Sequence, residues 1–181
     1  LFLNKQEQAL ESLKLYLQRA NSSEQVPQVE MEIGEIYFNK LKQYQNAIQH
    51  YERLLEGKKF SLEQRQLFFY RIARSYFLMG KMKSAIEAYE KALRIPANQE
   101  FKKRVLLDVG HAWYAIGDSE KSGFQNAMLA YSKAQQEIKN VRDPLYLEAE
   151  FGIASSMEEL DQLEQAYQKF KAIEANYPSP N

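Results

Sequence analysis

The sequence predicts an all-α fold built from repeated helix pairs, and three observations support this prediction. Between widely spaced prolines, apolar residues recur at intervals of three and four, which is typical of amphipathic helices. No series of segments alternates apolar and polar residues with turn signals between them, as paired strands would. An alanine also recurs at intervals of 38, 38, 42 and 39 residues, at Ala9, Ala47, Ala85, Ala127 and Ala166.

The elements follow this spacing in order. A half unit, residues 1–20, opens the chain, and we expect residues 5–19 to be a second helix without its partner. Four full units follow, at about 27–57, 61–95, 98–140 and 143–177. Both ends of the chain break off within the pattern, which indicates a segment of a longer array. The alternative is that the terminal helices cap the stack.

Helix starts are marked within these units. Ser61 and Gln64 have the spacing of a capping box, which predicts a helix beginning directly after Ser61. Asp143 followed by Pro144 is typical of an N-cap with proline at the first helical position. The third unit carries an insertion at residues 119–124, between its two helices.

The central units share a longer pattern. A small residue is followed by an aromatic, a glycine and then Ala-x-x-x-Tyr-x-x-Ala, at Ala73, Tyr76, Gly80, Ala85, Tyr89 and Ala92, and at Gly110, Trp113, Gly117, Ala127, Tyr131 and Ala134. This pattern resembles the tetratricopeptide repeat, a helix-turn-helix unit of about 34 residues. The resemblance implies a single array, residues 1–181, wound as a right-handed superhelical α-solenoid. Less complete copies contain Gly34, Tyr37, Ala47 and Tyr51, and Ala154, Met157, Ala166 and Phe170.

The small residues of the pattern predict close helix packing. Gly34, Ala73, Gly110 and Ala154 would let the second helix of the same unit approach, and Ala47, Ala85, Ala127 and Ala166 would meet it from the other side. The aromatic residues of the second helices would fill the space between adjacent units. A large side chain at such an alanine should overpack the contact by about 1–3 kcal/mol.

The composition argues against several kinds of chemistry. Equal numbers of basic and acidic residues, 24 each, give no uniform field for nucleic acid, and the absence of cysteine removes thiolate chemistry. His50 and His111 lack the spacing of a metal motif. No phosphate-binding loop, nucleophile elbow or membrane-spanning run is present. We therefore predict no enzyme activity, catalytic residue, metal or cofactor, no nucleic-acid partner and no membrane span.

Charge is nevertheless unevenly distributed. From Asp143 onward there are eight acidic residues against Lys169 and Lys171, which leaves a net charge of +6 for residues 1–142. Either these charges simply form an ordinary solvated surface, or their uneven distribution steers a partner toward the protein.

The resemblance implies that the first helices line a concave groove. Carried over by position, the groove residues are Met31, Glu35, Phe38, Asn39, Tyr70, Arg71, Arg74, Phe77, Arg104, Leu107, Asp108, His111, Tyr114, Phe151, Ser155 and Glu158. Aromatic residues and arginines are favoured at the centres of protein interfaces. The alternative, that some of them complete the core instead, is open for Tyr70, Arg74, Phe77, His111 and Tyr114.

One known ligand of the family is disfavoured. Chaperone-binding members hold a carboxylate with a clamp of lysine, asparagine and arginine, whereas the corresponding places here hold Met31, Glu35, Arg71, Arg104 and Asp108. Arg71, Arg74 and Arg104 could still attract an acidic or phosphorylated segment.

These features predict a non-catalytic scaffold that binds a peptide or helix of a protein partner. The alternative is a homo-oligomer joined through residues 5–19 or through the last unit. The closing phrase, residues 166–180, is similar to the ends of repeats in bacterial envelope proteins, namely outer-membrane assembly lipoproteins and the periplasmic coordinator of the Tol–Pal system. That similarity favours the bacterial periplasm or outer-membrane periphery, with the cytoplasm as the alternative.

Overall fold

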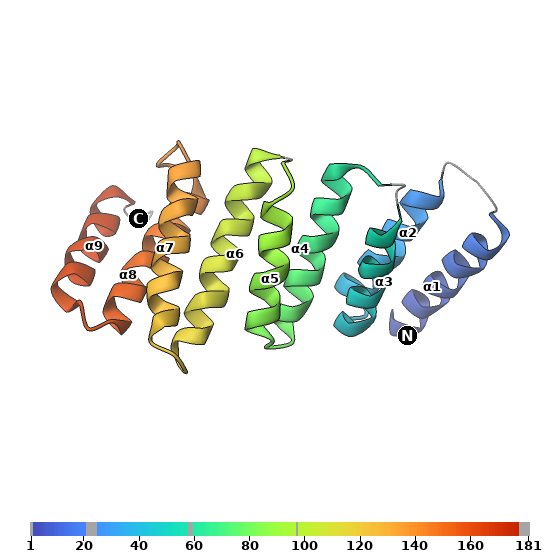
Figure 1. Cartoon of the computed structure of the whole chain (residues 1–181), viewed down its shortest axis with the longest axis horizontal. Coiled ribbons are helices and arrows are strands. Elements are labelled where there is room, and N and C mark those ends of the chain that lie inside the picture. Colours follow the sequence, from blue (N-terminus) through green and yellow to red (C-terminus); the bar gives the residue numbers. More distant parts are fainter. Residues whose placement is uncertain (1, 21–24, 58–59, 97, 178–181) are drawn as a thin grey trace.

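The computed structural model describes residues 2–20, 25–57, 60–96 and 98–177. Within these ranges the chain forms α-helices and one π-helical turn, with no strand, so the all-α prediction is confirmed (Figure 1). In chain order the elements are α1 (Phe2–Arg19), α2 (Val26–Glu35), η1 (Ile36–Lys40), α3 (Tyr44–Glu56), α4 (Leu62–Leu78), α5 (Met82–Leu93), α6 (Gln99–Gly117), α7 (Ser122–Glu137), α8 (Pro144–Glu159) and α9 (Leu163–Asn176).

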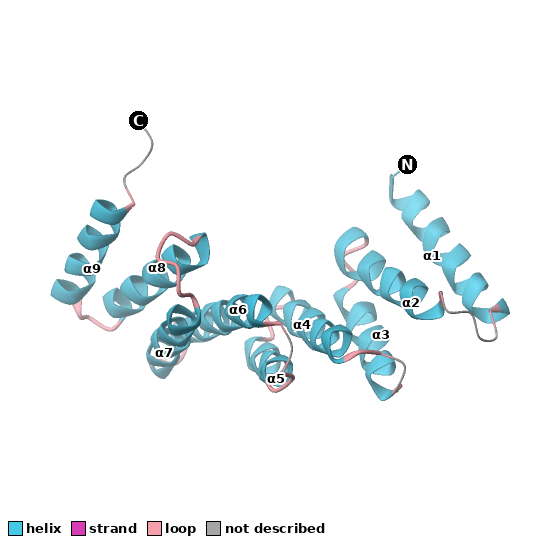
Figure 2. Cartoon of the chain, turned by 90° about the horizontal axis from the view of Figure 1, so that it is seen from above, coloured by secondary structure: helices cyan, strands magenta, loops and turns pink. Residues whose placement is uncertain are grey.

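The helices pair in sequence order and stack side by side. The first helices are α2, α4, α6 and α8, and their partners are α3, α5, α7 and α9. Figure 2 shows that the row curves into an arc, with the first helices on its inner side and their partners on its outer side. α1 continues the outer row, because its Leu10 packs against Ile33 and Ile36 of the next pair.

Local signals in the sequence place the helix ends. The Ser61 side chain accepts a hydrogen bond from the Gln64 backbone N–H, and the Gln64 side chain accepts one from the Ser61 N–H, so the predicted capping box is confirmed. The Asp143 carboxylate accepts from the Leu145 N–H at 2.9 Å, and α8 begins at Pro144, as predicted. Half of the 119–124 insertion extends the start of α7, where Phe124 is buried.

Glycines and tyrosines interlock between the helices. A Cβ atom on Gly34 would lie 2.5 Å from Cε1 of Tyr51, and one on Gly152 would lie 2.5 Å from Cε2 of Tyr131. The Tyr131 ring also contacts Gly110 of α6, so it lies between two successive helix pairs. Ala47, Ala85 and Ala127 are fully buried, as the close-packing prediction requires.

The π-helical turn was not predicted. It follows α2 directly, and the Leu41 N–H donates to the Ile36 carbonyl oxygen at 2.9 Å, five residues earlier. A π-turn takes in an extra residue and so rotates the side chains that follow it relative to an α-helical pattern. Phe38 lies in this turn, is buried, and packs edge-on against Tyr44 with ring centroids 5.8 Å apart.

Candidate partner-binding face

Ion pairs join neighbouring first helices along the inner side of the arc, which we call the inner face. Arg71 of α4 donates two hydrogen bonds to the Glu35 carboxylate of α2, at 2.6 and 3.0 Å. Arg104 of α6 donates to Glu148 of α8 at 3.3 Å. Bidentate and charge-assisted contacts of this kind fix both orientation and distance. Adjacent repeats are therefore tied together along the inner face.

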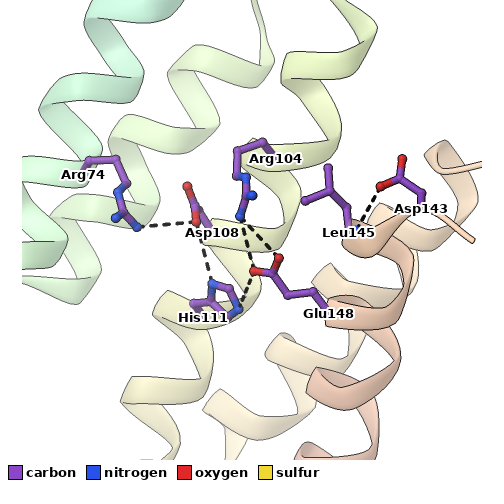
Figure 3. Close-up of polar contacts among 7 residues, drawn as sticks. All are labelled: Arg74, Arg104, Asp108, His111, Asp143, Leu145 and Glu148. Carbon is purple, nitrogen blue, oxygen red and sulfur yellow. Dashed lines mark hydrogen bonds and ion pairs between the residues drawn. The ribbon is translucent and has the colours of Figure 1, made fainter. Parts of the chain in front are cut away.

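A buried carboxylate stands at the centre of the inner face (Figure 3). Asp108 is only 3% exposed, and its Oδ1 lies 3.6 Å from Nη1 of Arg74 and 3.7 Å from Nδ1 of His111. The other ring nitrogen of His111 lies 3.5 Å from Glu148 Oε1. His111 therefore bridges carboxylates from α6 and α8, while Arg74 supplies the positive charge that a buried carboxylate needs.

Two tyrosines, one partly and one fully buried, stay neutral beside this carboxylate. Burial, reinforced by the charge of Asp108, raises the pKa of Tyr70 to about 12. The same two causes raise the pKa of Tyr89, which is fully buried in α5. A second negative charge next to Asp108 would be costly if a phenol ionised, so both phenols stay neutral at neutral pH.

The predicted groove residues fall into three groups by exposure. Phe38, Leu107 and Asp108 are buried, so their predicted exposure in a groove is wrong. Partly buried are Met31, Glu35, Tyr70, Arg71, Arg74, Phe77, Arg104, His111, Tyr114 and Ser155. Asn39, Phe151 and Glu158 are exposed. Phe38 and Leu107 belong to the core because each packs among apolar side chains of its own and neighbouring helices.

One repeat position explains part of this result. Tyr70, Leu107 and Phe151 each stand three residues before the small residue of their repeat. Tyr70 packs edge-on against Phe101 of α6 at 4.9 Å, and Leu107 is fully buried in a cluster that includes residues of α8. Phe151, in the last described pair, is 45% exposed and faces Phe170. Residues at this position pack where helices meet more than they line a groove.

A second repeat position forms the inner face proper. The residue directly after the small residue is Glu35, Arg74, His111 or Ser155 in successive first helices, and all four are partly exposed. Sequence reasoning selected these residues but missed Glu148, which pairs with both Arg104 and His111. The repeat could have revealed Glu148, because it stands six residues before Ala154, as Arg104 stands six before Gly110.

Two models of known protein families match parts of the chain. A family model described as anaphase-promoting complex, cyclosome, subunit 3 matches residues 40–111, and a tetratricopeptide repeat model matches residues 148–180. These two matches support a tetratricopeptide repeat protein. No curated protein is significantly similar to it in sequence.

Solved structures share this repeat fold. MamA is 17% identical, with 98% of this chain and 89% of that chain covered and a TM-score of 0.70. A putative kinesin light chain of Podosopora anserina, with TPR-like repeats, is 17% identical over 97% and 90%, with a TM-score of 0.71. Bacillus thuringiensis PlcR, solved with the peptide PapR7 and DNA, is 16% identical over 96% and 65%, with a TM-score of 0.62. At these identities the likeness concerns the fold.

The remaining histidine of the repeat array is structural. His50 is buried, and its Nε2 lies 2.8 Å from the Glu30 carbonyl oxygen. Burial lowers the pKa of His50, so the ring is neutral at neutral pH. No group of three or more potential metal ligands occurs within the described ranges. None of the helices described is both long and apolar enough to cross a membrane.

Proposed function

We propose that this tetratricopeptide-type repeat protein is a non-catalytic scaffold that binds a segment of a protein partner along its inner face. One observation carries the proposal. Partly exposed Glu35, Arg74 and His111 occupy the same position in successive repeats. Glu35 and Arg74 are held by ion pairs to neighbouring helices, and a ring nitrogen of His111 lies 3.5 Å from Glu148 of α8. A surface fixed before binding loses little conformational entropy when a partner arrives.

The ion pairs also limit what the partner can be. Arg71, Arg74 and Arg104 each face a carboxylate of a neighbouring first helix or of the central cluster. Their charge is thus largely balanced. An acidic or phosphorylated segment would bind these paired arginines less strongly than it would bind three free ones. A segment of mixed polarity, extended or helical, fits better, because it can use guanidinium donors and carboxylate acceptors without breaking the pairs.

Affinity capture with matched variants tests this proposal. The inner variant carries Arg104→Ala and His111→Ala, and the outer control carries Lys133→Ala and Gln136→Ala, two exposed residues of α7. Thermal unfolding establishes that both variants remain folded. We expect proteins captured by the parent chain and by the outer control to be lost with the inner variant. Equal capture by both variants would remove the inner face as the binding surface.

Self-association is the alternative, and the charge distribution disfavours it. Residues 1–57 contain eight acidic and six basic residues, and residues 143–181 contain eight acidic and two basic residues. Two ends with net negative charge repel each other in a head-to-tail contact. We expect a monomer by light scattering at high protein concentration, and a concentration-dependent dimer would revive the alternative.

Residence in the bacterial envelope stays a prediction from one motif. It rests on residues 166–180, of which 178–180 lie outside the described residues. Neither family description names such a location.

A further inference from the structure

A cleft on the outer side of the arc lies between α3 and α5, with α4 beneath it. We call it the outer groove. Its volume is about 360 Å³, and it is lined by Glu52, Leu55, Glu56, Arg65, Phe69, Ile72, Tyr76, Ser84, Glu87, Ala88 and Lys91. Binding clefts for small groups span roughly 300–1,000 Å³. The outer groove is thus large enough for one long side chain with its immediate neighbours.

The floor of the outer groove is apolar. Phe69 and Ile72 of α4 and Leu55 of α3 line it and pack on the same core cluster. Ile72 is buried, while Phe69 and Leu55 are partly exposed. An aliphatic chain laid along these side chains would remove apolar surface from water on both partners.

Three carboxylates stand around this floor. Glu52 and Glu56 come from α3 and Glu87 from α5, and all three are exposed. Among the residues that the structure describes, none of them has an ion-pair partner. Burial raises the pKa of Tyr76, and the charges of Glu52 and Glu87 raise it further. Glu52 and Glu87 thus stand on opposite walls of the outer groove, which Tyr76 also lines.

Two basic residues, Arg65 and Lys91, line the outer groove against its three carboxylates. Arg65 donates to the Gly57 carbonyl oxygen at 3.0 Å, which holds its guanidinium where α3 ends and α4 begins. Lys91 lies near the end of α5, which runs antiparallel to α4, so it belongs to the same end of the cleft. Glu52 and Glu87 stand about one helical turn farther from this end, four residues before Glu56 and Lys91 respectively.

The charge of the outer groove is not a consequence of the repeat pattern. In the next groove, over α6, the equivalents of Glu56 and Glu87 are Arg94 and Leu129. In the preceding groove, over α2, the equivalent of Glu52 is Lys14, which lies over the Tyr37 ring at 5.7 Å. Among the described helices, three carboxylates at these outer positions therefore combine with an apolar floor only between α3 and α5.

We propose that the outer groove is a second docking site, which takes a lysine or arginine side chain from an apolar and basic segment of a protein partner. The aliphatic stem lies on Phe69 and Ile72, and the cationic head lies between Glu52 and Glu87. Long basic side chains bury their stems on apolar surface while the charge stays at a polar rim. The outer groove and the inner face lie on opposite sides of the arc, so this inference does not depend on the proposed function.

A titration with matched peptides tests the proposal. The probe is a blocked pentapeptide with lysine between two leucines, and its controls carry norleucine or glutamate in place of the lysine. Backbone amide shifts of the full chain, recorded by two-dimensional NMR, report both the location and the affinity of binding. The variant is Glu52→Gln with Glu87→Gln. Its control is Glu90→Gln, an exposed carboxylate of α5 that does not line the outer groove.

The proposal predicts shifts confined to α3, α4 and α5 with the lysine peptide, and weaker binding at high salt. Partly exposed ion pairs are each worth a few-fold in affinity, so the double variant should bind roughly tenfold more weakly. Glu90→Gln should bind as the parent does. Equal binding of the norleucine or glutamate peptide, shifts on other helices, or unchanged affinity of the double variant would each overturn the proposal.

Discussion

Replacing Gly110 by alanine tests the packing that joins successive repeats. Tyr131 is 2% exposed, and its ring contacts Gly110 of α6 on one side and Gly152 of α8 on the other. A Cβ on Gly110 would lie 2.5 Å from Cδ1 of Tyr131, well inside van der Waals contact. The ring has no room to retreat, because a Cβ on Gly152 would be equally close to its far edge.

The expected loss of stability for Gly110→Ala is the balance of two opposing effects. Overpacking a well-packed core costs about 1–3 kcal/mol. Because the Tyr131 ring is held on both sides, we expect a cost at the upper end of this range. Alanine in a helix is favoured over glycine by about 1 kcal/mol. The expected net loss for Gly110→Ala is therefore about 2 kcal/mol, which corresponds to a fall in Tm of about 4–8 °C for a chain of this size.

Urea and thermal unfolding followed by circular dichroism measure this loss. Gly57→Ala is the matched control, because its Cβ would meet its nearest neighbour at an ordinary 3.4 Å. Tyr131→Leu should relieve the clash, so the double variant with Gly110→Ala should lose less than the sum of the single losses. A Gly110→Ala protein as stable as the parent, or losses that simply add, would refute the packing argument.

Three further outcomes follow from the same contacts. Because the folded chain holds the phenol protons of Tyr70 and Tyr89 more tightly than the unfolded chain does, stability should be constant up to about pH 10 and fall above it. Urea unfolding at pH 8, 10 and 11 measures this, and a flat profile would contradict it. Arg71→Ala should lower the free energy of unfolding by about 1 kcal/mol. A double-mutant cycle with Glu35→Ala should show that the two losses are coupled. Purely additive losses would disprove the ion pair between Arg71 and Glu35. Ser61→Ala should lose about 1 kcal/mol in urea unfolding through the capping box, and a neutral result would show that the cap is dispensable.

The helical repeat could be predicted from the sequence because its signals are local or periodic. The capping box at Ser61, the proline after Asp143 and the recurring alanines each follow from backbone chemistry or from the space between two helices. Gly34 and Gly110 were selected as close-packing residues on the same ground, and the rings of Tyr51 and Tyr131 lie against them.

The inner face could be predicted only in part. Position within the repeat selected Glu35, Arg74 and His111, but it did not show that each is tied to a neighbouring helix. Such pairs depend on side chains that lie about 35 residues or more apart in the sequence. The π-helical turn at Ile36–Lys40 was not predicted, and Phe38, which lies in it, is in the core and not on the predicted surface.

The outer groove was not predicted at all. Its carboxylates belong to α3 and α5, and its floor belongs largely to α4, so no single segment carries the pattern. Comparison of equivalent positions between repeats reveals it only once the helices are known to lie side by side, because the informative feature is the departure of Glu56 and Glu87 from the next repeat.

Site-specific photo-crosslinking tests the central claim, that the inner face binds a protein segment, most directly. A benzoylphenylalanine residue is placed at Ser155 on the inner face or at Leu129, which is 55% exposed on α7. After irradiation in extract of the native cells, crosslinks should form to a discrete partner from Ser155 and not from Leu129. Crosslinks to that partner from Leu129 alone would contradict the claim.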